Sequence, residues 1–280
     1  MEIKFDHVSF VIDAYTPLEK TIISDVSFEI KSPGIYSFIG RSNSGKTAIG
    51  DLINALIMPT RGKVKIGRFI NDGRMIKNIN KLRFQTGYVF KNPYDMFFNK
   101  TVRSEIEFGM KYFKYKLEKI DLRASDALKL VGLDDSYLNM NPQDLTLVDA
   151  KKVALACALV YNPNILILDE YTAGLNNNDK KELIRLLRLL KNKYNKTIIL
   201  LSKDTNFCYQ ITDYVYLMNL TKLVAFGGRE LLRDIDALNQ IGVEVPKIVT
   251  FIDECKKKGR YIHDYTNILD LIKGVYRDVF

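Results

Sequence analysis

Long apolar runs are missing from this sequence. The longest uninterrupted ones include Val153–Val160 and Ile165–Leu168, which fall far short of the roughly 20 residues that a helix needs to cross a bilayer. The first five residues lack the charged-then-apolar layout of a signal peptide. We therefore expect any link to a membrane to come through a partner protein.

Cysteine, histidine and tryptophan are scarce, at three, two and none. Cys157, Cys208 and Cys255 are far apart, odd in number and without metal-ligand spacing, which is typical of reduced thiols in a cytosolic protein. The formal net charge is +9. This excess fits a compositional bias of the source genome, since Lys, Asn, Ile and Tyr are all abundant, or a basic surface for anionic lipid or nucleic acid.

Short apolar runs alternate with longer amphipathic segments, which is typical of a mainly parallel sheet covered by helices. Three runs predict buried strands: Ile35–Ile39, Ile165–Leu168 and Thr197–Leu201. Apolar residues at helical spacing predict helices over Thr47–Ile57, ended by Pro59, and over Lys180–Lys193.

Other parts of the chain depart from this pattern. Ile3–Phe10 and Thr21–Ile30 predict half-buried antiparallel strands around a loop with a proline. A helix-rich stretch from about residue 99 to 141 interrupts the sheet pattern. Strands stop near Phe226, and Gly227-Gly228 begins a helical tail.

A phosphate-binding loop follows the first buried strand. The G-x-x-x-x-G-K-[ST] pattern is matched by Gly40, Arg41, Ser42, Asn43, Ser44, Gly45, Lys46 and Thr47. Every fixed position is filled, by Gly40, Gly45, Lys46 and Thr47. Glycines let backbone N–H groups curl around phosphate oxygens, and the following helix offers its positive N-terminal end. Lys46 can reach the β and γ phosphates, and the Thr47 hydroxyl can bind Mg²⁺. The loop therefore predicts binding of ATP with Mg²⁺.

Two adjacent carboxylates end the strand Ile165–Leu168. Ligands of open α/β sheets bind at the carboxyl ends of the strands, so we expect Asp169 and Glu170 beside the phosphate loop. Asp169 would hold Mg²⁺, directly or through water, and Glu170 would polarise the attacking water. The pair is a weak motif alone and a strong one together with the loop.

At this point the motifs are similar to those of a known family. Asn162–Glu170 and the following Tyr171–Asn176 resemble the Walker B and D-loop region of ABC ATPases. Four further segments resemble the Q-loop region of one branch of this family: Gly87–Phe90, Asn92-Pro93, Phe98 and Glu107–Gly109. That branch is the energy-coupling factor (ECF) transporters, which import vitamins and metal ions. The second of the two paired ECF ATPase subunits is similar in two further segments, Thr16–Glu19 and Gly242–Ile248.

The resemblance implies an α/β P-loop NTPase fold with a RecA-like core, an antiparallel β subdomain, a helical subdomain at about residues 92–150 and a small C-terminal helical extension. Residues 1–226 would form the nucleotide-binding domain, and residues 227–280 would pair two ATPase subunits. The implied partners are a second ECF-type ATPase subunit in a heterodimer, a transmembrane coupling subunit and a substrate-binding membrane subunit. Through them the chain would lie on the cytoplasmic face of the cell membrane.

Two lysines replace uncharged catalytic side chains of the family. Lys91 stands for the glutamine that contacts the metal and the attacking water, and a cation beside Mg²⁺ is unfavourable unless its side chain turns away. Lys203 stands for the switch histidine and could still donate to a γ-phosphate oxygen. The two histidines, His7 and His263, lie far from this motif in the sequence.

The family signature Leu-Ser-Gly-Gly-Gln is also altered, because it aligns with Leu145, Thr146, Leu147, Val148 and Asp149. The family's glycines let a helix N-terminus approach the γ-phosphate of the other subunit in a head-to-tail pair, whereas Leu147 and Val148 carry side chains there. Asp149 adds a negative charge. The D-loop aspartate is replaced by Asn176, a milder loss. Both ATP sites of a heterodimer would thus carry a defect from this chain.

Unconstrained drift is the alternative reading of each replacement, but the intact P-loop and acidic pair argue against drift of the whole site. We therefore expect a transport ATPase that couples ATP binding and hydrolysis to uptake of vitamins or other micronutrients and is catalytically impaired by itself. A non-hydrolysing regulatory subunit of the same complex is the alternative. A soluble ABC ATPase acting on nucleic acid rests only on the basic charge, and the C-terminal resemblance argues against it.

Three features leave further alternatives open. Phe10 and Tyr15 are candidates for stacking on adenine, or else ordinary core and surface residues. Lys256–Arg260 is read as a solvated helix end in preference to a contact with lipid headgroups or nucleic acid. A groove for the membrane subunit, or core packing, would account for Tyr94, Met96, Phe97 and Phe98.

Overall fold

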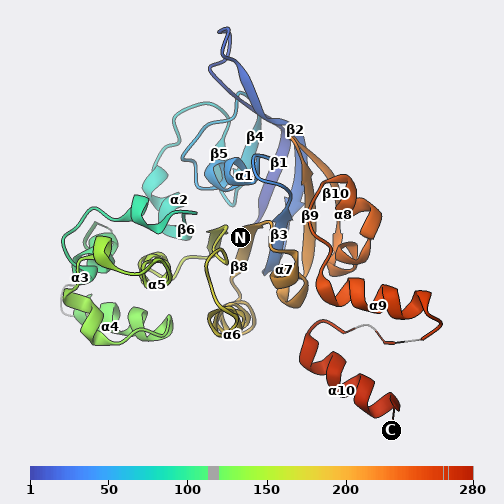
Figure 1. Ribbon diagram of the computed structural model, residues 1–280. Helices are drawn as coiled ribbons and strands as arrows, with labels where there is room; N and C mark the ends of the chain where they lie inside the picture. The colour runs from blue at the N-terminus through green and yellow to red at the C-terminus, as the bar shows by residue number, and fades with distance from the viewer. Residues whose placement is uncertain (113–119, 261, 264, 280) are drawn as a thin grey trace.

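Two β-sheets form the framework of the structure, a computed structural model that describes residues 1–112, 120–260, 262–263 and 265–279 (Figure 1). Within these residues the larger sheet has the strand order β10-β9-β3-β8-β7-β6, and the smaller has the order β2-β1-β4-β5. The larger sheet is parallel except for β10, which runs antiparallel to β9. The predicted α/β architecture is confirmed.

The larger sheet is built from buried apolar runs. Its strands are β3 (Gly34–Ile39), β6 (Thr86–Val89), β7 (Ile165–Asp169), β8 (Thr197–Ser202), β9 (Tyr214–Asn219) and β10 (Lys222–Gly228). Along β7, Leu166 and Leu168 pack into one core, and Ile165 and Ile167 pack into the core on the opposite face. A strand covered on both faces reads as a continuous apolar run, which is why the sequence reveals it.

The smaller sheet is antiparallel throughout and precedes or interrupts the larger one in the chain. Its strands are β1 (Ile3–Ile12), β2 (Lys20–Ile30), β4 (Arg61–Ile66) and β5 (Phe69–Asn71). The β1–β2 hairpin rises at the top of Figure 1, and Tyr15 and Leu18 are exposed at its tip. The hairpin fits the predicted pair of antiparallel strands around a loop.

Helices complete the two cores. They are α1 (Lys46–Ile53), α2 (Ile79–Gln85), α3 (Val102–Tyr112), α4 (Ile120–Leu130), α5 (Leu147–Leu159), α6 (Asn177–Tyr194), α7 (Thr205–Ile211), α8 (Ile235–Gln240), α9 (Lys247–Lys257) and α10 (Ile268–Val279). One core lies between the larger sheet, α1 and the smaller sheet. The other lies on the opposite face, under α5, α6 and α7, and extends to α3 and α4 on one side and to α8 and α9 on the other.

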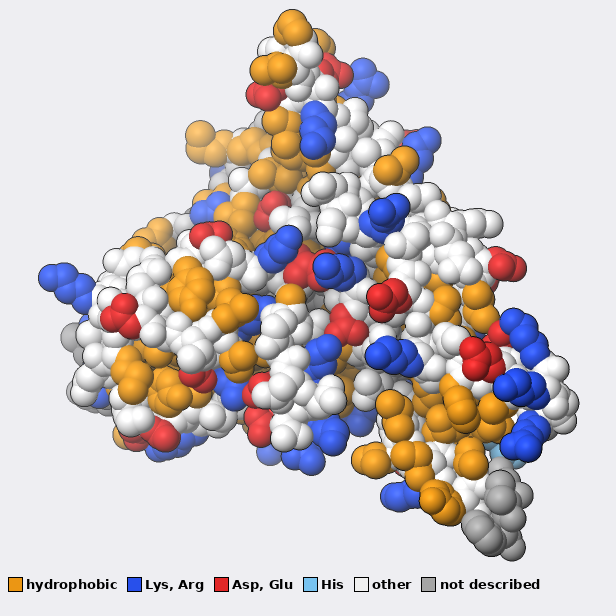
Figure 2. All heavy atoms as spheres, viewed as in Figure 1, with side chains coloured by type: hydrophobic (Ala, Val, Ile, Leu, Met, Phe, Trp, Pro, Cys, Tyr) orange, Lys and Arg blue, Asp and Glu red, His pale blue; other side chains and the backbone are white. Residues whose placement is uncertain are grey.

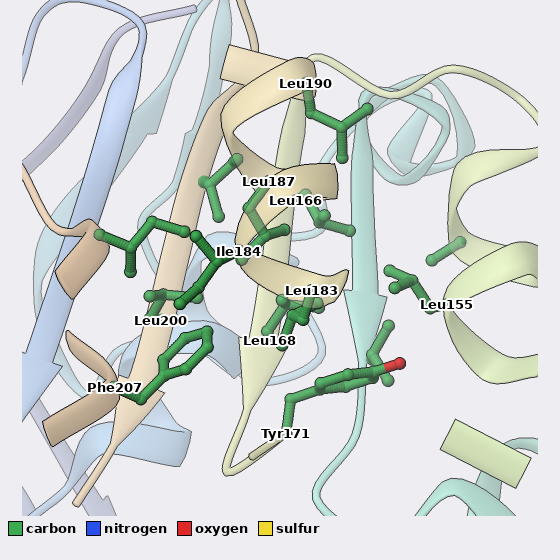
Figure 3. Packing of buried hydrophobic residues seen from close by; sticks show 14 of the residues in the cluster. Leu155, Leu166, Leu168, Tyr171, Leu183, Ile184, Leu187, Leu190, Leu200 and Phe207 are labelled. Carbon is green, nitrogen blue, oxygen red and sulfur yellow. The ribbon is translucent and has the colours of Figure 1, made fainter. Parts of the chain in front are cut away.

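Helix α6 packs on this second face through apolar residues that recur at helical spacing in the sequence. Leu183, Ile184, Leu187 and Leu190 recur at helical spacing and are buried. Figure 3 shows these side chains above Leu166 and Leu168 of β7 and Leu200 of β8. The helix is thereby fixed against β8 and against β7, whose carboxyl end carries the acidic pair.

Helix α1 is shorter than the sequence predicts, because it ends at Ile53 and not at Ile57. The Asn54 side chain donates to the carbonyl and the hydroxyl of Thr86, both at 2.9 Å, and so turns toward β6. Ala55 then adopts a left-handed backbone with φ of 53°. The Leu56 N–H donates to the Asp51 carbonyl at 2.8 Å, which closes the helix end. Pro59 plays no part in ending the helix.

The chain continues past β10 into a helical tail. The tail contains α8, α9 and α10, and the last two lie at the lower right of Figure 1. In the part of the chain that the structure describes, no helix combines the length and the apolar character needed to span a bilayer.

The packing of α6 predicts a large difference between two leucines of one helix. Leu187→Ala should lower the free energy of unfolding by about 2–5 kcal/mol, because Leu187 is fully buried and its loss leaves a cavity. Leu189→Ala is the matched control; Leu189 is 40% exposed, and its change should stay within about 0.5 kcal/mol. Denaturant unfolding measures both, and equal losses would contradict the packing described.

Candidate functional site

The phosphate loop connects the end of β3 to the start of α1. Asn43 and Gly45 have φ of 64° and 91°, so the backbone turns through left-handed conformations there. A side chain at Gly40 would collide with the Met218 carbonyl and the Ser44 hydroxyl. The sequence therefore forms a tight loop whose shape depends on glycine at position 40.

Lys46 is held at the mouth of this loop. Its ammonium donates to the carbonyl oxygens of Gly40 and Arg41, each at 2.8 Å, and lies 3.6 Å from Glu170 Oε1. Burial lowers the pKa of Lys46, and the negative charges of Glu170 and Asp169 oppose that shift. The ammonium is thus a nearly buried cation at the position where a phosphate loop needs one.

Thr47 and Asp169 form a pair of oxygen donors beside Lys46. The Thr47 hydroxyl donates to Asp169 Oδ2 at 2.8 Å, while Asp169 Oδ1 is buried and has no hydrogen-bond partner among the described residues. Burial raises the pKa of Asp169 to about 6. A hydroxyl and a carboxylate with a free oxygen are ligands that Mg²⁺ prefers, so these residues fit the metal.

The described residues contain no group of three or more His, Cys, Asp or Glu side chains that could hold a metal by itself. Thr47 and Asp169 therefore suit an ion that takes its remaining ligands from water and substrate phosphates, as Mg²⁺ does in nucleotide sites.

Glu170 follows β7 in a left-handed backbone conformation with φ of 43°. Its N–H donates to the Leu201 carbonyl of β8 at 2.8 Å. Its carboxylate accepts a long hydrogen bond from the Lys203 N–H at 3.3 Å and faces Lys46. A non-glycine residue in this region stores about 1–3 kcal/mol of strain, which is typical of functional positions.

Two cavities are lined by residues of this charged centre. The larger, of about 880 Å³, lies between the phosphate loop, Glu170, Lys203 and the tail segment Asn239–Glu244. The smaller, of about 470 Å³, contains Thr47, Asp169 and Lys91. Asp51 and Asp95 add two more carboxylates to the smaller cavity. The structure thus groups Lys91, Lys203 and Glu170 around the phosphate loop.

The two lysines approach the site differently. Lys91 follows β6 and lines the smaller cavity together with Thr47 and Asp169. Lys203 follows β8; its side chain is exposed and reaches the larger cavity, while its N–H contacts Glu170. Lys91 and Lys203 thus add positive charge to the two cavities that hold the site's carboxylates.

The segment Leu145–Asp149 lies at the N-terminus of α5. Thr146 caps the helix, because its hydroxyl accepts from the Asp149 N–H at 3.2 Å and donates to the Asp149 carboxylate at 2.8 Å. Leu147 is 42% exposed and packs against Gly174. The helix start is thus capped by the Thr146 hydroxyl, and the Asp149 carboxylate adds a negative charge beside it.

The comparisons with known proteins agree with this geometry. A family model described as ABC transporter matches residues 23–173. The energy-coupling factor transporter ATP-binding protein EcfA2 of Streptococcus sanguinis is 32% identical over 277 residues, which cover 98% of this chain and 99% of that protein. The chain belongs to the ECF branch of the ABC transporter ATP-binding proteins.

Solved structures show the same fold. The ATP-binding cassette MJ0796, as a post-hydrolysis dimer bound to ADP and Pi, gives a TM-score of 0.76 at 22% identity, covering 81% of this chain and 98% of that one. The structure of cbiO1 from Clostridium perfringens, part of the ABC transporter complex cbiONQ, gives a TM-score of 0.71 at 24% identity, covering 90% and 98%. The expected ABC ATPase fold is confirmed.

In this ECF ATPase, Asn176 keeps a structural role at the D-loop position. It caps α6, and its side-chain oxygen accepts from the N–H groups of Asn178 at 2.8 Å and Asp179 at 3.0 Å. Asparagine and aspartate cap helices about equally well. The replacement therefore removes a charge and leaves the start of α6 intact.

Two features of the ECF ATPase site were not predicted as parts of it. Lys151 of α5 contacts the backbone carbonyls of Glu170 and Tyr171, and nothing in the local sequence distinguishes it from its neighbour Lys152. Gly242 of the tail lies against the Arg41 side chain, and the Thr205 hydroxyl donates to the Glu244 carbonyl at 2.7 Å. These tail contacts join residues far apart in the sequence, and no local pattern indicates them.

The buried carboxylate of this ECF ATPase predicts an unusual stabilising variant. Asp169 keeps its proton up to a pH of about 6 in the folded protein, against 3.8 without burial. Between these values the folded state binds more protons than the unfolded state, so stability falls as the pH rises and stays lower above that window. In EDTA near neutral pH, Asp169→Asn should therefore raise the free energy of unfolding by up to about 3 kcal/mol.

Denaturant unfolding in EDTA measures this gain, with Asp13→Asn on the exposed hairpin as the neutral control. Addition of Mg²⁺ and ATP should reverse the order, because Asp169 then regains a cationic partner and only the wild type is stabilised by binding. An Asp169→Asn variant less stable than the wild type in EDTA would contradict this account.

Proposed function

We propose that this chain energises substrate uptake as the ATP-binding subunit of an ECF-type importer, and that it binds Mg-ATP well but hydrolyses it slowly by itself. The observation that carries the proposal is the contrast within one site. Lys46, Thr47 and Asp169 are grouped as a phosphate and metal site requires, whereas the side chains at positions 91 and 203 are cations.

The residues that would bind ATP and Mg²⁺ each have a distinct role in this proposal. The N–H groups of Gly40–Thr47 would cradle the phosphate chain, and Lys46 would leave its carbonyl partners to contact the β and γ phosphates. Thr47 and Asp169 would hold Mg²⁺, which neutralises phosphate charge when bound. The buried, unpaired Asp169 oxygen supports this assignment, because it gains a partner on binding.

The hydrolytic half is altered. Glu170 would polarise the attacking water, and its buried carboxylate faces the phosphate loop. Lys91 lies in the cavity of the metal ligands, where a cation repels Mg²⁺. Lys203 could donate to a γ-phosphate oxygen, but its side chain is longer than a histidine and flexible. Water would therefore be positioned poorly, and turnover would be slow.

The signature segment would impair the second site of a pair. Family members place a helix N-terminus against the partner's γ-phosphate, but here Thr146 and Asp149 occupy that end with their own hydrogen bonds. The carboxylate of Asp149 would repel a phosphate as well. A heterodimer with a second ECF-type ATPase would therefore be an asymmetric motor in which turnover depends on the partner.

The tail after residue 226 supports pairing of ATPase subunits. Figure 2 shows hydrophobic side chains gathered at the lower right, over α9 and α10. Phe251, Ile268, Leu269 and Ile272 are 44–60% exposed there. We propose residues 1–226 as the nucleotide-binding domain and residues 227–280 as the dimerisation extension. An apolar surface of this kind is typical of an interaction site.

The helical region at residues 92–150 would contact the transmembrane coupling subunit. Phe98 is 65% exposed and packs edge-to-face on Phe108, with ring centroids 4.6 Å apart, and Tyr112 continues the group. Phe97 is buried, and Tyr94 and Met96 are half-buried, so core packing accounts better for these three. The proposed contact places the chain on the cytoplasmic face of the membrane, while a separate membrane subunit binds the vitamin or other micronutrient.

A second function has two observations in its favour. The closed cap at Thr146 and the cations at positions 91 and 203 also suit a regulatory subunit that binds nucleotide and never hydrolyses it. In that case the motor would run entirely on the partner's catalytic residues. Binding of nucleic acid has no comparable structural support.

Affinity purification of the tagged chain from membranes tests the transporter assignment. We expect a second ATP-binding subunit and at least one polytopic membrane protein in the eluate, in near-equal amounts. Salt washes that strip charge-driven contacts should leave this complex intact, since the exposed tail surface is apolar. Recovery of nucleic acid with no membrane protein would overturn the proposal.

A further inference from the structure

Lys151 is a buried cation in the second turn of α5. It is 2% exposed, and among the described residues no carboxylate forms an ion pair with its ammonium. Its neighbour Lys152 is the ordinary case, because it forms ion pairs with Asp179 at 3.2 Å and with Glu182 at 3.9 Å. A lysine buried without a carboxylate partner carries a desolvation penalty that its surroundings must offset.

Three backbone carbonyls supply that compensation. The ammonium donates to the carbonyl oxygens of Glu170 at 3.3 Å, Tyr171 at 2.9 Å and Ala173 at 2.5 Å. It also lies 5.7 Å from the centre of the Tyr171 ring. An ammonium has three N–H donors, so all of them are used on one turn of the chain.

These contacts constrain the turn that carries Glu170. If the turn changed shape, the ammonium would lose carbonyl partners in a site that water does not reach, and an unpaired buried charge is costly. Burial already lowers the pKa of Lys151 to about 8. Figure 3 shows Tyr171 extending from the end of β7 toward Leu155 of α5, so the ring and the ammonium both tie this turn to the same helix.

The same helix touches the turn at a second point. Leu147, one helical turn before Lys151, packs against Gly174. Lys151 and Leu147 thus bracket residues 170–174 from one face of α5. The signature segment at the N-terminus of α5 and the backbone of Glu170 are therefore joined through a single rigid element.

We propose that Lys151 is a positioning residue that holds the turn from Glu170 to Ala173, so that the Glu170 carboxylate faces Lys46 and the phosphate loop. The proposal rests on the proposed function of Glu170. In a head-to-tail pair, Glu170 belongs to one ATP site and the signature segment of the same chain belongs to the other. The contacts of Lys151 would therefore make the position of Glu170 depend on the position of the signature segment.

The test compares Lys151→Gln, Lys151→Arg and the control Lys152→Gln, each purified as the complex with its partner subunits. Single-turnover hydrolysis of Mg-ATP bound to this chain gives the kcat and KM of its own site, and hydrogen exchange gives amide protection over residues 169–176. We expect Lys151→Gln to lower kcat by about tenfold to a hundredfold with KM changed less than about twofold, since a misplaced catalytic group affects chemistry more than binding. Exchange in residues 170–174 should be faster, and Lys152→Gln should match the wild type in both measurements.

Lys151→Arg keeps the charge and the donors, so it should retain the protection of residues 170–174 and part of kcat. A folded Lys151→Gln variant with wild-type kcat and wild-type exchange would overturn the proposal, as would exchange raised equally over the whole chain. If the wild-type complex does not hydrolyse ATP, the proposed function fails, and exchange alone then decides the role of Lys151. If Lys151→Gln does not fold, loss of local protection in Lys151→Arg would overturn the proposal.

Discussion

The structure depends on a small group of charges kept away from water at the carboxyl ends of the parallel strands. Lys46, Asp169 and Glu170 are all less than a tenth exposed, and the Lys46 ammonium lies 3.6 Å from Glu170 Oε1. Such a group is tolerable only because backbone carbonyls, the Thr47 hydroxyl and neighbouring N–H groups contact it. Because these charges are buried between two cores, they interact with a phosphate more strongly than they would in water.

The altered residues act on this group in different ways. Lys91 and Lys203 add positive charge around the carboxylates, which favours an anionic ligand and disfavours a divalent metal and a well-placed water. Lys151 contacts this group only through the backbone, because its ammonium donates to the Glu170 carbonyl. At the N-terminus of α5 the Thr146 hydroxyl is hydrogen-bonded to Asp149, which underlies our proposal that this end serves a partner's nucleotide poorly. These features are the basis of our proposal that the subunit is better suited to holding ATP than to hydrolysing it.

Local patterns in the sequence predicted much of this site. The phosphate loop and the acidic pair after β7 follow from glycines at fixed spacing and from a continuous apolar strand, and the structure brings them together. The end of α1 was predicted wrongly, because the Asn54 side chain bonds to Thr86 and Ala55 turns left-handed, which are tertiary effects. Lys151 and the tail segment at Gly242 were missed for the same reason, since their partners lie far away in the chain.

The most direct test of the central claim is to replace both unusual cations in the chain's own site. The double variant Lys91→Gln, Lys203→His is compared with the wild type in the purified complex, by equilibrium ATP binding and by the rate at which a single bound ATP is hydrolysed. The account predicts that both proteins bind ATP and that the double variant hydrolyses it faster by about tenfold or more, with the gain abolished by adding Glu170→Gln. A wild-type site that already hydrolyses its bound ATP rapidly in a Glu170-dependent way, or a double variant with no gain, would contradict it.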